Sequence, residues 1–307
     1  MEALDQVHLA FDPASLRVLN LVLALIMFGV ALDLRLADFG GVLKQPRAVV
    51  AGLLGQLVLL PAMTLGLILV IAPPPSVALG MIIVAACPGG NVSNLFTHLA
   101  RGNTSLSITM TAITTVSALV ITPLNLAFWG SLAPGVSGLL RAIALDPIDM
   151  ITAIGLILGV PLILGMVMAS RLPGVAARLR GPMRGLSMLA LAGFIVAALA
   201  KNFGAFVDHL PAVLALVAVH NALAFLLGNL TARAFRLAEP DRRALTVEVG
   251  IQNSGLGLIL IFDFFTGLGG AAFIAATWGV QHLLAGSALV AYWSRRRSPA
   301  AAAAPAA

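Results

Sequence analysis

Long apolar stretches, separated by short polar segments, run along the chain from about residue 16 to residue 293. A helix that spans a membrane needs about 20 mostly apolar residues, and these stretches reach that length. They are continuous rather than alternating, which argues against the roughly 10-residue strands of a membrane barrel. The predicted spanning helices are about 16–32, 46–71, 76–100, 103–131, 148–170, 183–202, 211–236, 241–265 and 268–293.

The composition supports a membrane environment. Of 307 residues, 60% are hydrophobic and 10% are charged, and the mean hydropathy is +1.03. Soluble domains are about half apolar and a quarter charged, and disordered chains have low hydrophobicity. The composition therefore excludes a soluble globular enzyme and a disordered chain. The one cysteine, Cys87, also excludes an internal disulfide and a metal site built from several cysteines.

The basic residues predict how the chain crosses the membrane. The net charge is +6 and the pI is about 11.0, a balance that would suggest nucleic-acid binding in a soluble domain. Here the basic residues cluster between alternate spans. With the amino terminus outside, all 18 except Arg17, Arg141 and Lys201 fall on the inside, as the positive-inside rule expects. We therefore expect a multi-pass protein of the cell inner membrane with a cytoplasmic carboxyl terminus and no nucleic-acid partner.

The two ends of the chain differ from the spans. The first 15 residues are acidic and lack the basic region of a signal peptide, so no cleavable signal is expected. Residues 294–307 are basic and then rich in Ala and Pro, which is typical of a disordered segment. We expect residues 294–307 to form a disordered cytoplasmic tail.

The third predicted span contains a signal for a break. Its sequence, MIIVAACPGGNVSNLFTHLA, places Pro-Gly-Gly at 88–90 in the middle, and Asn91, Ser93 and Asn94 follow directly. Proline removes a backbone donor, and glycine permits non-helical torsion angles. A simple kink is the alternative, since both residues are common in membrane helices. A kink does not need three polar side chains beside it, so we predict a broken helix.

The eighth predicted span, ALTVEVGIQNSGLGLILIF, carries Glu248 and the polar residues 252–254 among three glycines. A carboxylate within a span costs a few kcal/mol, so such residues face the bundle interior or water. The alternative is that Glu248 lies near the cytoplasmic interface and pairs with Arg242 or Arg243. The flanking glycines favour a second broken helix that lines a cavity.

The positions of the two breaks predict the architecture. The third and eighth spans are five apart in order, so they cross the membrane in opposite senses. Interrupted segments at corresponding places in two halves are typical of transporters built on inverted repeats, here four plus four spans with the fifth unmatched. The predicted fold is an all-α polytopic membrane protein with about nine transmembrane helices, inverted repeats and two broken crossing helices.

At these residues the chain resembles the bile acid:sodium symporter family. The similarity is carried by Cys-Pro-Gly-Gly at 87–90 with Ser93-Asn94, by Leu-Ala-Arg-Gly-Asn at 99–103, and by Glu-Val-Gly-Ile-Gln-Asn-Ser-Gly at 248–255. It extends from about residue 28 to residue 293. The resemblance implies that the broken helices cross near the membrane midplane with two sodium ions behind the crossing. It also implies one transporter domain over residues 1–307, with a core of about 46–131 and 211–293 and a panel of about 16–32 and 148–202.

The resemblance further implies the ligands of the two sodium ions. The first site would use Ser93, Asn94, Ser107, Thr111 and Glu248. The second site would use Gln56, Glu248, Gln252 and the backbone carbonyls of Val249 and Ile251. Oxygen ligands suit a hard cation, and Ser107 and Thr111, four residues apart, share a helix face. Packing between helices through small polar residues is the alternative for Ser107 and Thr111.

Two sodium ions that share one carboxylate would leave a net positive charge, which favours an anionic substrate. Helix termini exposed at the breaks would favour the same charge. Our candidates for polar contacts to the substrate are Asn91, Asn253, Ser254 and His282, with a hydrogen bond between helices as the alternative for His282. Asn91 stands where relatives often have Thr, and Leu283 stands where some have Asn, so the identity of the substrate does not transfer.

The sequence therefore predicts a sodium-coupled secondary active symporter that imports an organic anion, bile-acid-like or a small carboxylate, by alternating access. Its expected partners are sodium ions, the organic anion and the lipid bilayer. We expect no cofactor beyond sodium as the coupling ion and no obligate protein partner. The alternative is a proton-coupled or metalloid-oxyanion efflux carrier of related fold, in which Glu248 would carry a proton. The sequence offers no pair of catalytic residues at membrane depth, so it does not favour an enzyme.

Overall fold

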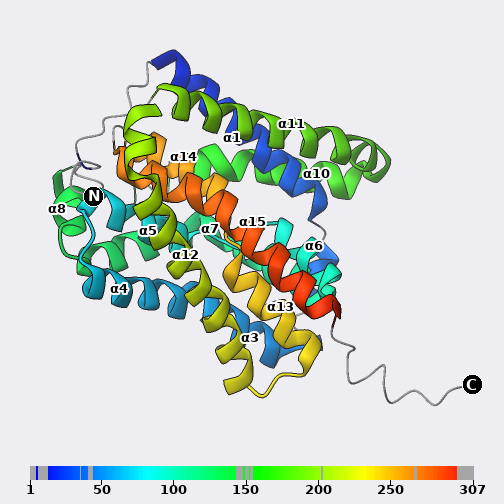
Figure 1. Cartoon of the computed structure of the whole chain (residues 1–307). Coiled ribbons are helices and arrows are strands. Elements are labelled where there is room, and N and C mark those ends of the chain that lie inside the picture. The colour runs from blue at the N-terminus through cyan, green and yellow to red at the C-terminus, as the bar shows by residue number, and fades with distance from the viewer. Residues whose placement is uncertain are drawn as a thin grey trace, which may run out of the picture.

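The structure is a computed structural model, which describes residue 5 and residues 13–34, 36–40, 44–142, 148, 152, 155–201, 203–265 and 268–295. These residues form a bundle of helices (Figure 1). In chain order the elements are α1 (Pro13–Asp33), η2 (Leu36–Gly40), α3 (Pro46–Leu54), the π-helical turn η3 (Gly55–Leu59), α4 (Leu60–Ile71), α5 (Pro75–Ala86), α6 (Val92–Leu99), α7 (Thr104–Leu132), α8 (Val136–Ala142), the π-helical turn η4 (Gly155–Gly159), α10 (Val160–Arg171), α11 (Pro173–Lys201), α12 (Phe203–Ala234), α13 (Glu239–Gly250), α14 (Ser254–Phe264) and α15 (Gly269–Arg295).

Several helices have the length and composition of membrane spans. Among the described residues, four helical segments are long and apolar enough to cross a membrane: Pro46–Ile71, Thr104–Leu132, His209–Ala234 and Gly269–Arg295. The first of these consists of α3, η3 and α4 in one continuous helix. Shorter apolar helices include α5, α10 and α14. The prediction of an all-α polytopic membrane protein is confirmed.

Some predicted boundaries differ from those of the structure. Helix α11 begins at Pro173, well before the predicted span 183–202, and therefore contains Arg178 and Arg180. Arginine ends an apolar stretch without breaking a helix, because it is a good helix former. For the same reason α15 extends to Arg295 and includes the first two residues of the predicted tail. Residues 296–307 of that tail lie outside the described residues.

Both predicted breaks are present. The third span divides into α5 and α6, and the eighth divides into α13 and α14. The backbone is extended at Cys87, with φ −71° and ψ 155°, and at Ile251, with φ −113° and ψ 99°. A simple kink in the third span is therefore excluded. Each break leaves main-chain groups that a membrane interior cannot hydrate.

The two unwound segments satisfy these groups by pairing with each other. Gly89 and Gln252 form an antiparallel bridge. Gly90 N donates to the Ile251 carbonyl at 3.0 Å, and Asn253 N donates to the Pro88 carbonyl at 2.8 Å. The broken helices therefore meet at their breaks, and the crossing is held by main-chain hydrogen bonds.

The helices form two groups. Helices α1, α10 and α11 pack on one another and form a layer at the top of Figure 1. Most other long helices, among them α5, α7, α12, α13 and α15, pack together beneath this layer. Helix α14 contacts α1 and so connects the two groups. The upper layer contains the described part of the predicted panel, and the functional division into core and panel stays a prediction.

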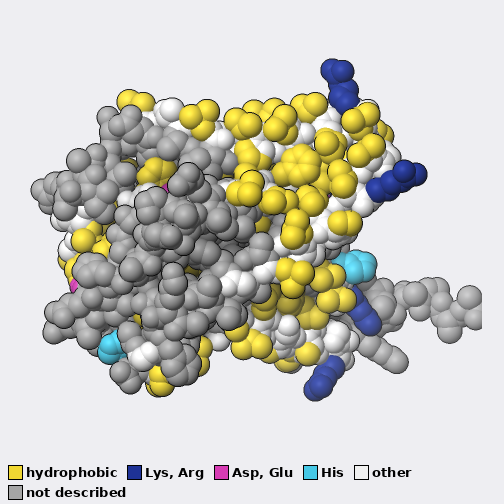
Figure 2. Space-filling view, turned by 90° about the horizontal axis from the view of Figure 1, so that it is seen from above, with side chains coloured by type: hydrophobic (Ala, Val, Ile, Leu, Met, Phe, Trp, Pro, Cys, Tyr) yellow, Lys and Arg dark blue, Asp and Glu magenta, His cyan; other side chains and the backbone are white. Residues whose placement is uncertain are grey.

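The crossing lies inside the protein. Every residue of Ser76–Ala86 in α5 is buried, and so is every residue of Ser254–Phe262 in α14. The outer faces are apolar instead. Figure 2 shows one such face, on which hydrophobic side chains gather and Lys and Arg side chains project at the edge. Polar groups at the crossing are thereby screened from lipid by surrounding helices.

Candidate functional site at the crossing of the broken helices

The carboxylate of Glu248, near the end of α13, is fully buried beside the crossing. Three hydroxyls donate hydrogen bonds to it. Ser93 Oγ and Ser107 Oγ donate to Oε2 at 2.6 and 2.8 Å, and Thr111 Oγ1 donates to Oε1 at 2.7 Å. These bonds replace the hydration that a buried carboxylate loses, and bonds to a charged acceptor are the stronger kind. Glu248 is thus anchored to α6 through Ser93 and to α7 through Ser107 and Thr111.

The interface alternative for Glu248 is wrong. Arg243 Nε donates to Glu239 Oε1 at 3.0 Å, and Arg243 Nη1 donates to the Ala100 carbonyl at 2.7 Å. Arg242 also forms an ion pair with Glu239. Both guanidinium groups therefore bind at the first turn of α13. Arg243 in addition binds the end of α6, and this first turn is the end of α13 opposite to the crossing.

The five residues predicted for the first sodium site lie together. Besides the three hydroxyls on Glu248, Asn94 Oδ1 lies 3.3 Å from Thr111 Oγ1. Ser107 and Thr111 therefore contact a carboxylate and an amide, which packing alone would not require. Thr97, which was not among the predicted site residues, donates from Oγ1 to Ser107 Oγ at 3.3 Å. Its position four residues after Ser93, on the same face of α6, is the signal that could have identified it.

The residues predicted for the second sodium site also lie together, on η3 and at the end of α13. Gln56 Nε2 donates to Gln252 Oε1 at 3.4 Å, and Gln252 Nε2 donates to the Val249 carbonyl at 2.8 Å. The Ile251 carbonyl accepts from Gly90 at the crossing. Gln56 Oε1 is buried and has no hydrogen-bond partner among the described residues. This amide oxygen is therefore available to a ligand.

Gly89 brings the two groups of residues into contact. A Cβ atom at this position would collide with Glu248 Oε1 and would lie 3.0 Å from Gln56 Nε2. Only a residue without a side chain allows the backbone to come so close to both. Glu248 Oε1 and Gln56 Nε2 therefore lie close to each other across Gly89, so the carboxylate that accepts from the three hydroxyls is also near the residues predicted for the second site.

Side chains bind the main-chain groups at the broken ends. Thr122 Oγ1 of α7 donates to the Ala86 carbonyl at 2.8 Å, where α5 ends. Asn221 Nδ2 of α12 donates to the Gly250 carbonyl at 2.8 Å, where α13 ends. Asn253 Oδ1 accepts the first-turn N–H of α14 at 3.0 Å. These bonds satisfy groups that lipid cannot and hold the unwound segments in one position.

The predicted substrate contacts lie around the same crossing. Asn91 precedes α6, and its side chain makes no capping bond, while Asn253 and Ser254 begin α14. A Cβ at Gly279 of α15 would lie 2.8 Å from Ser254 Oγ, so α15 touches the break. His282 is buried on that helix face, one turn further along, and its Nδ1 has no partner among the described residues. The substrate roles of these residues stay predictions.

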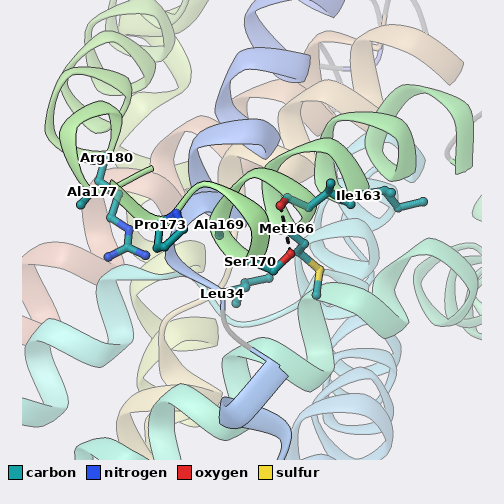
Figure 3. Close-up of a pocket in the computed structure, with 9 residues that line it drawn as sticks. Leu34, Ile163, Met166, Ala169, Ser170, Pro173, Ala177 and Arg180 are labelled. Carbon is teal, nitrogen blue, oxygen red and sulfur yellow. Dashed lines mark hydrogen bonds between the residues drawn. The ribbon is translucent and has the colours of Figure 1, made fainter. Parts of the chain in front are cut away.

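A cavity of about 680 Å³ lies elsewhere, between the end of α1, α10 and the start of α11 (Figure 3). Arg180 lies at one end, where its Nε donates to the Leu32 carbonyl at 2.8 Å and lies 3.6 Å from Asp33 Oδ1. None of the residues predicted for sodium or substrate binding lines it. The lining is otherwise mostly apolar and comprises Leu34, Ile163, Met166, Val167, Ala169, Ser170, Pro173, Ala177 and Arg180.

Known proteins share this sequence pattern. The family model for the Sodium Bile acid symporter family matches residues 20–209. The chain is 31% identical over 284 residues to an uncharacterized sodium-dependent transporter, YocS, of Bacillus subtilis, and the match covers 91% of this chain and 83% of that protein.

Plant proteins are similar as well. The chain is 30% identical to the probable sodium/metabolite cotransporter BASS1, chloroplastic, of Arabidopsis thaliana, over 90% of this chain and 66% of that protein. It is 28% identical to the probable sodium/metabolite cotransporter BASS2, chloroplastic, of rice (Oryza sativa), over 91% of this chain and 64% of that protein. The chain therefore spans just under two thirds of these plant relatives. The family match, the Bacillus relative and the broken-helix crossing together show that the chain belongs to the sodium bile acid symporter family and is a multi-pass membrane transporter rather than an enzyme.

Proposed function

We propose that this transporter is a sodium-coupled symporter that imports an organic anion by alternating access. The observation that carries the proposal is the buried Glu248 carboxylate, held by hydroxyls beside the unwound segments of two broken helices. An ionisable residue inside a membrane protein typically belongs to an ion or substrate pathway. The description of the Bacillus relative as sodium-dependent, and of the plant relatives as sodium/metabolite cotransporters, supports the coupling ion.

Sodium ions would bind on two sides of Glu248. A hydroxyl that donates its proton to Glu248 keeps its lone pairs for a cation, so the present bonds are compatible with coordination. The free oxygen of Gln56 adds a ligand on the other side. The first ion would be held by Ser93, Asn94, Ser107, Thr111 and Glu248, and the second by Gln56, Glu248, Gln252 and the carbonyls of Val249 and Ile251.

The substrate would be an anion. Helices α6 and α14 both begin at the crossing, and the amino-terminal end of a helix carries partial positive charge. Two sodium ions beside one carboxylate add one net positive charge. We propose that Asn91, Asn253, Ser254 and His282 contact the anion, which would bind in front of the crossing.

The apolar cavity in Figure 3 supports an amphipathic anion. Its volume of about 680 Å³ falls within the range of small-molecule sites. Apolar side chains from α10 and α11 would contact the hydrocarbon part of the substrate, and the guanidinium of Arg180 would attract its charge. We propose that this cavity takes up the anion on its way to or from the crossing.

The proposed orientation follows from the basic residues. The transporter would lie in the cell inner membrane with its amino terminus outside and its carboxyl terminus in the cytoplasm. Sodium would then move inward down its gradient, and each charge gains about 2.3 kcal/mol per 100 mV of membrane potential. Sodium binding would order the crossing and the substrate site, and the core would then move against the panel.

A thermal-shift screen of the purified full-length protein tests the proposal. Organic anions are added in sodium chloride or in choline chloride at constant pH and ionic strength. We expect an anion to stabilise the protein only when sodium is present, because a ligand of the folded state raises its stability. Stabilisation that is equal in choline and depends on pH would support proton coupling instead. Sodium-independent stabilisation by a metalloid oxyanion alone would support the efflux carrier.

A further inference from the structure

The helical turn that carries Gln56 is built around a proline. In η3, Leu60 N donates to the Gly55 carbonyl, five residues earlier. In a regular α-helix the Leu57 carbonyl would accept from residue 61, but Pro61 has no N–H and its ring would crowd that carbonyl. The helix widens into a π-helical turn instead. Such turns are frequent at functional sites.

A side chain from α7 binds the displaced carbonyl. Asn125 Nδ2 donates to the Leu57 carbonyl at 2.9 Å. The same helix supplies Ser107 and Thr111 to Glu248. Helix α7 therefore holds both the hydroxyl groups on Glu248 and the turn that carries Gln56, and it sets the distance between them.

Helix α12 contacts the carboxyl-terminal end of the same turn, through Thr64. His220 Nε2 lies 2.7 Å from Thr64 Oγ1, and the Thr64 hydroxyl donates to the Leu60 carbonyl at 2.8 Å. Because that proton is used on Leu60, the imidazole must donate from Nε2. His220 is fully buried, and its ring packs edge to face on Trp278 at 4.7 Å. This chain of bonds ends at the residue that directly follows η3.

The next residue of α12 holds the other half of the second site. Asn221 Nδ2 binds the Gly250 carbonyl, which lies between the carbonyls of Val249 and Ile251. Gln252 Nε2 donates to the Val249 carbonyl, and Gly90 N donates to the Ile251 carbonyl at the crossing. Two consecutive side chains on one helix therefore connect Gln56 and the end of α13 to the same rigid element.

We infer that Asn125, His220 and Asn221 are positioning residues of the second sodium site. Asn125 and His220 fix the π-helical turn and so the direction of the Gln56 side chain. Asn221 fixes the main chain at Gly250 and so the positions of the neighbouring Val249 and Ile251 carbonyls. None of the three would touch the ion. The inference rests on the proposed function, since it assumes that sodium binds between Gln56 and the end of α13. If these bonds only pack helices together, as polar side chains often do in membranes, their loss would leave sodium affinity unchanged.

The test is a sodium titration of the purified full-length protein. The melting temperature is measured at each sodium concentration, and choline keeps the ionic strength constant. Asn125→Leu removes the bond to Leu57, and Thr64→Val removes the hydroxyl between His220 and Leu60 with little change in volume. We expect each to raise the half-saturating sodium concentration about tenfold and to lower the Hill coefficient toward one. Asn221→Leu has the same expected effect. His220→Gln, which keeps an N–H donor toward Thr64, should restore most of the affinity relative to His220→Leu.

Two controls and one further variant complete the test. Thr64→Ser keeps the hydroxyl, and Ser117→Ala removes a bond that stays within α7, so both should titrate as the wild type does. Pro61→Ala adds an N–H to the turn and covers the case in which Asn125→Leu does not fold. The inference would be overturned if Asn125→Leu, Thr64→Val and Pro61→Ala had the same half-saturating sodium concentration as the wild type. A wild-type protein that does not respond to sodium would refute the proposed function itself.

Discussion

Two π-helical turns of the same build lie in the two helix groups of this transporter. The turn η3 begins at Gly55, six residues before Pro61, and η4 begins at Gly155, six residues before Pro161. The second residue of each turn differs in kind. Gln56 is fully buried, whereas Leu156 is 64% exposed. The same main-chain geometry therefore carries a buried polar side chain at its second position in η3 and an exposed apolar side chain at that position in η4.

The difference shows that a widened helical turn does not make a site by itself. In η3 the turn is bound by Asn125 and, through Thr64, by His220, and its polar side chain meets Gln252. In η4 the sequence is GLILG, which offers no polar side chain. A proline follows each turn at the same distance, but only the turn at η3 has polar partners that could hold a side chain for the proposed ion binding. Four predictions test this comparison.

Glu248→Gln should have the largest effect, because it removes the one charge that both proposed sodium sites share. Uncompensated changes at buried charged groups cost about 3–5 kcal/mol, so sodium-driven uptake should fall at least a hundredfold. The measurement is uptake into proteoliposomes with an imposed sodium gradient. Gel filtration and thermal unfolding in choline check that the variant is folded. Retained sodium-driven uptake would show that neither proposed sodium site depends on the Glu248 carboxylate.

Exchanging the side chains of the two turns should have the next largest effect. Gln56→Leu removes a proposed ligand of the second ion, and we expect the half-saturating sodium concentration to rise ten- to a hundredfold, about 1.4–2.8 kcal/mol. Leu156→Gln creates the same residue in η4 without its partners and should leave sodium binding unchanged. For both variants the melting temperature is measured at increasing sodium concentrations. Equal effects of the two variants on sodium binding would show that the partners around η3 do not create a sodium site.

Replacing the prolines should separate the turns further. Pro61→Ala and Pro161→Ala each restore an N–H group and favour a regular α-helix. At η3 we expect this change to rotate Gln56 away from Gln252 and to lower the sodium affinity about tenfold. At η4 the change should leave the sodium affinity as it is and alter the melting temperature by only a few degrees. A Pro161→Ala variant with weakened sodium binding would contradict the comparison.

Arg180→Gln should have the smallest effect. The guanidinium already contacts the Leu32 carbonyl and Asp33, so only part of its charge is available to a substrate. We expect KM for an amphipathic anion to rise a few-fold, or less than about 1 kcal/mol, with no change in sodium affinity. Uptake at varied anion and fixed sodium concentration measures this. A shift in sodium affinity, with KM for the anion unchanged, would argue against a role for the cavity in substrate passage.

Much of the candidate site could be predicted from the sequence because its residues are chemically unusual where they stand. A glutamate, two glutamines and a run of Asn and Ser within apolar spans have few structural explanations. Thr97, Thr122 and Asn125 were not predicted, because a single Thr or Asn in a membrane helix is ordinary. Their roles depend on which neighbouring carbonyl or hydroxyl they reach, and no spacing along the chain encodes that distance.

The sequence by itself determined the membrane environment, most of the spans and the two breaks, because apolar length and the torsional limits of Pro and Gly act locally. Only the tertiary structure decided how those breaks are used. Ser93 and Glu248, 155 positions apart, meet because the two unwound segments pair in one register. That register depends on main-chain hydrogen bonds and close packing between distant helices. These contacts form only when the whole bundle assembles.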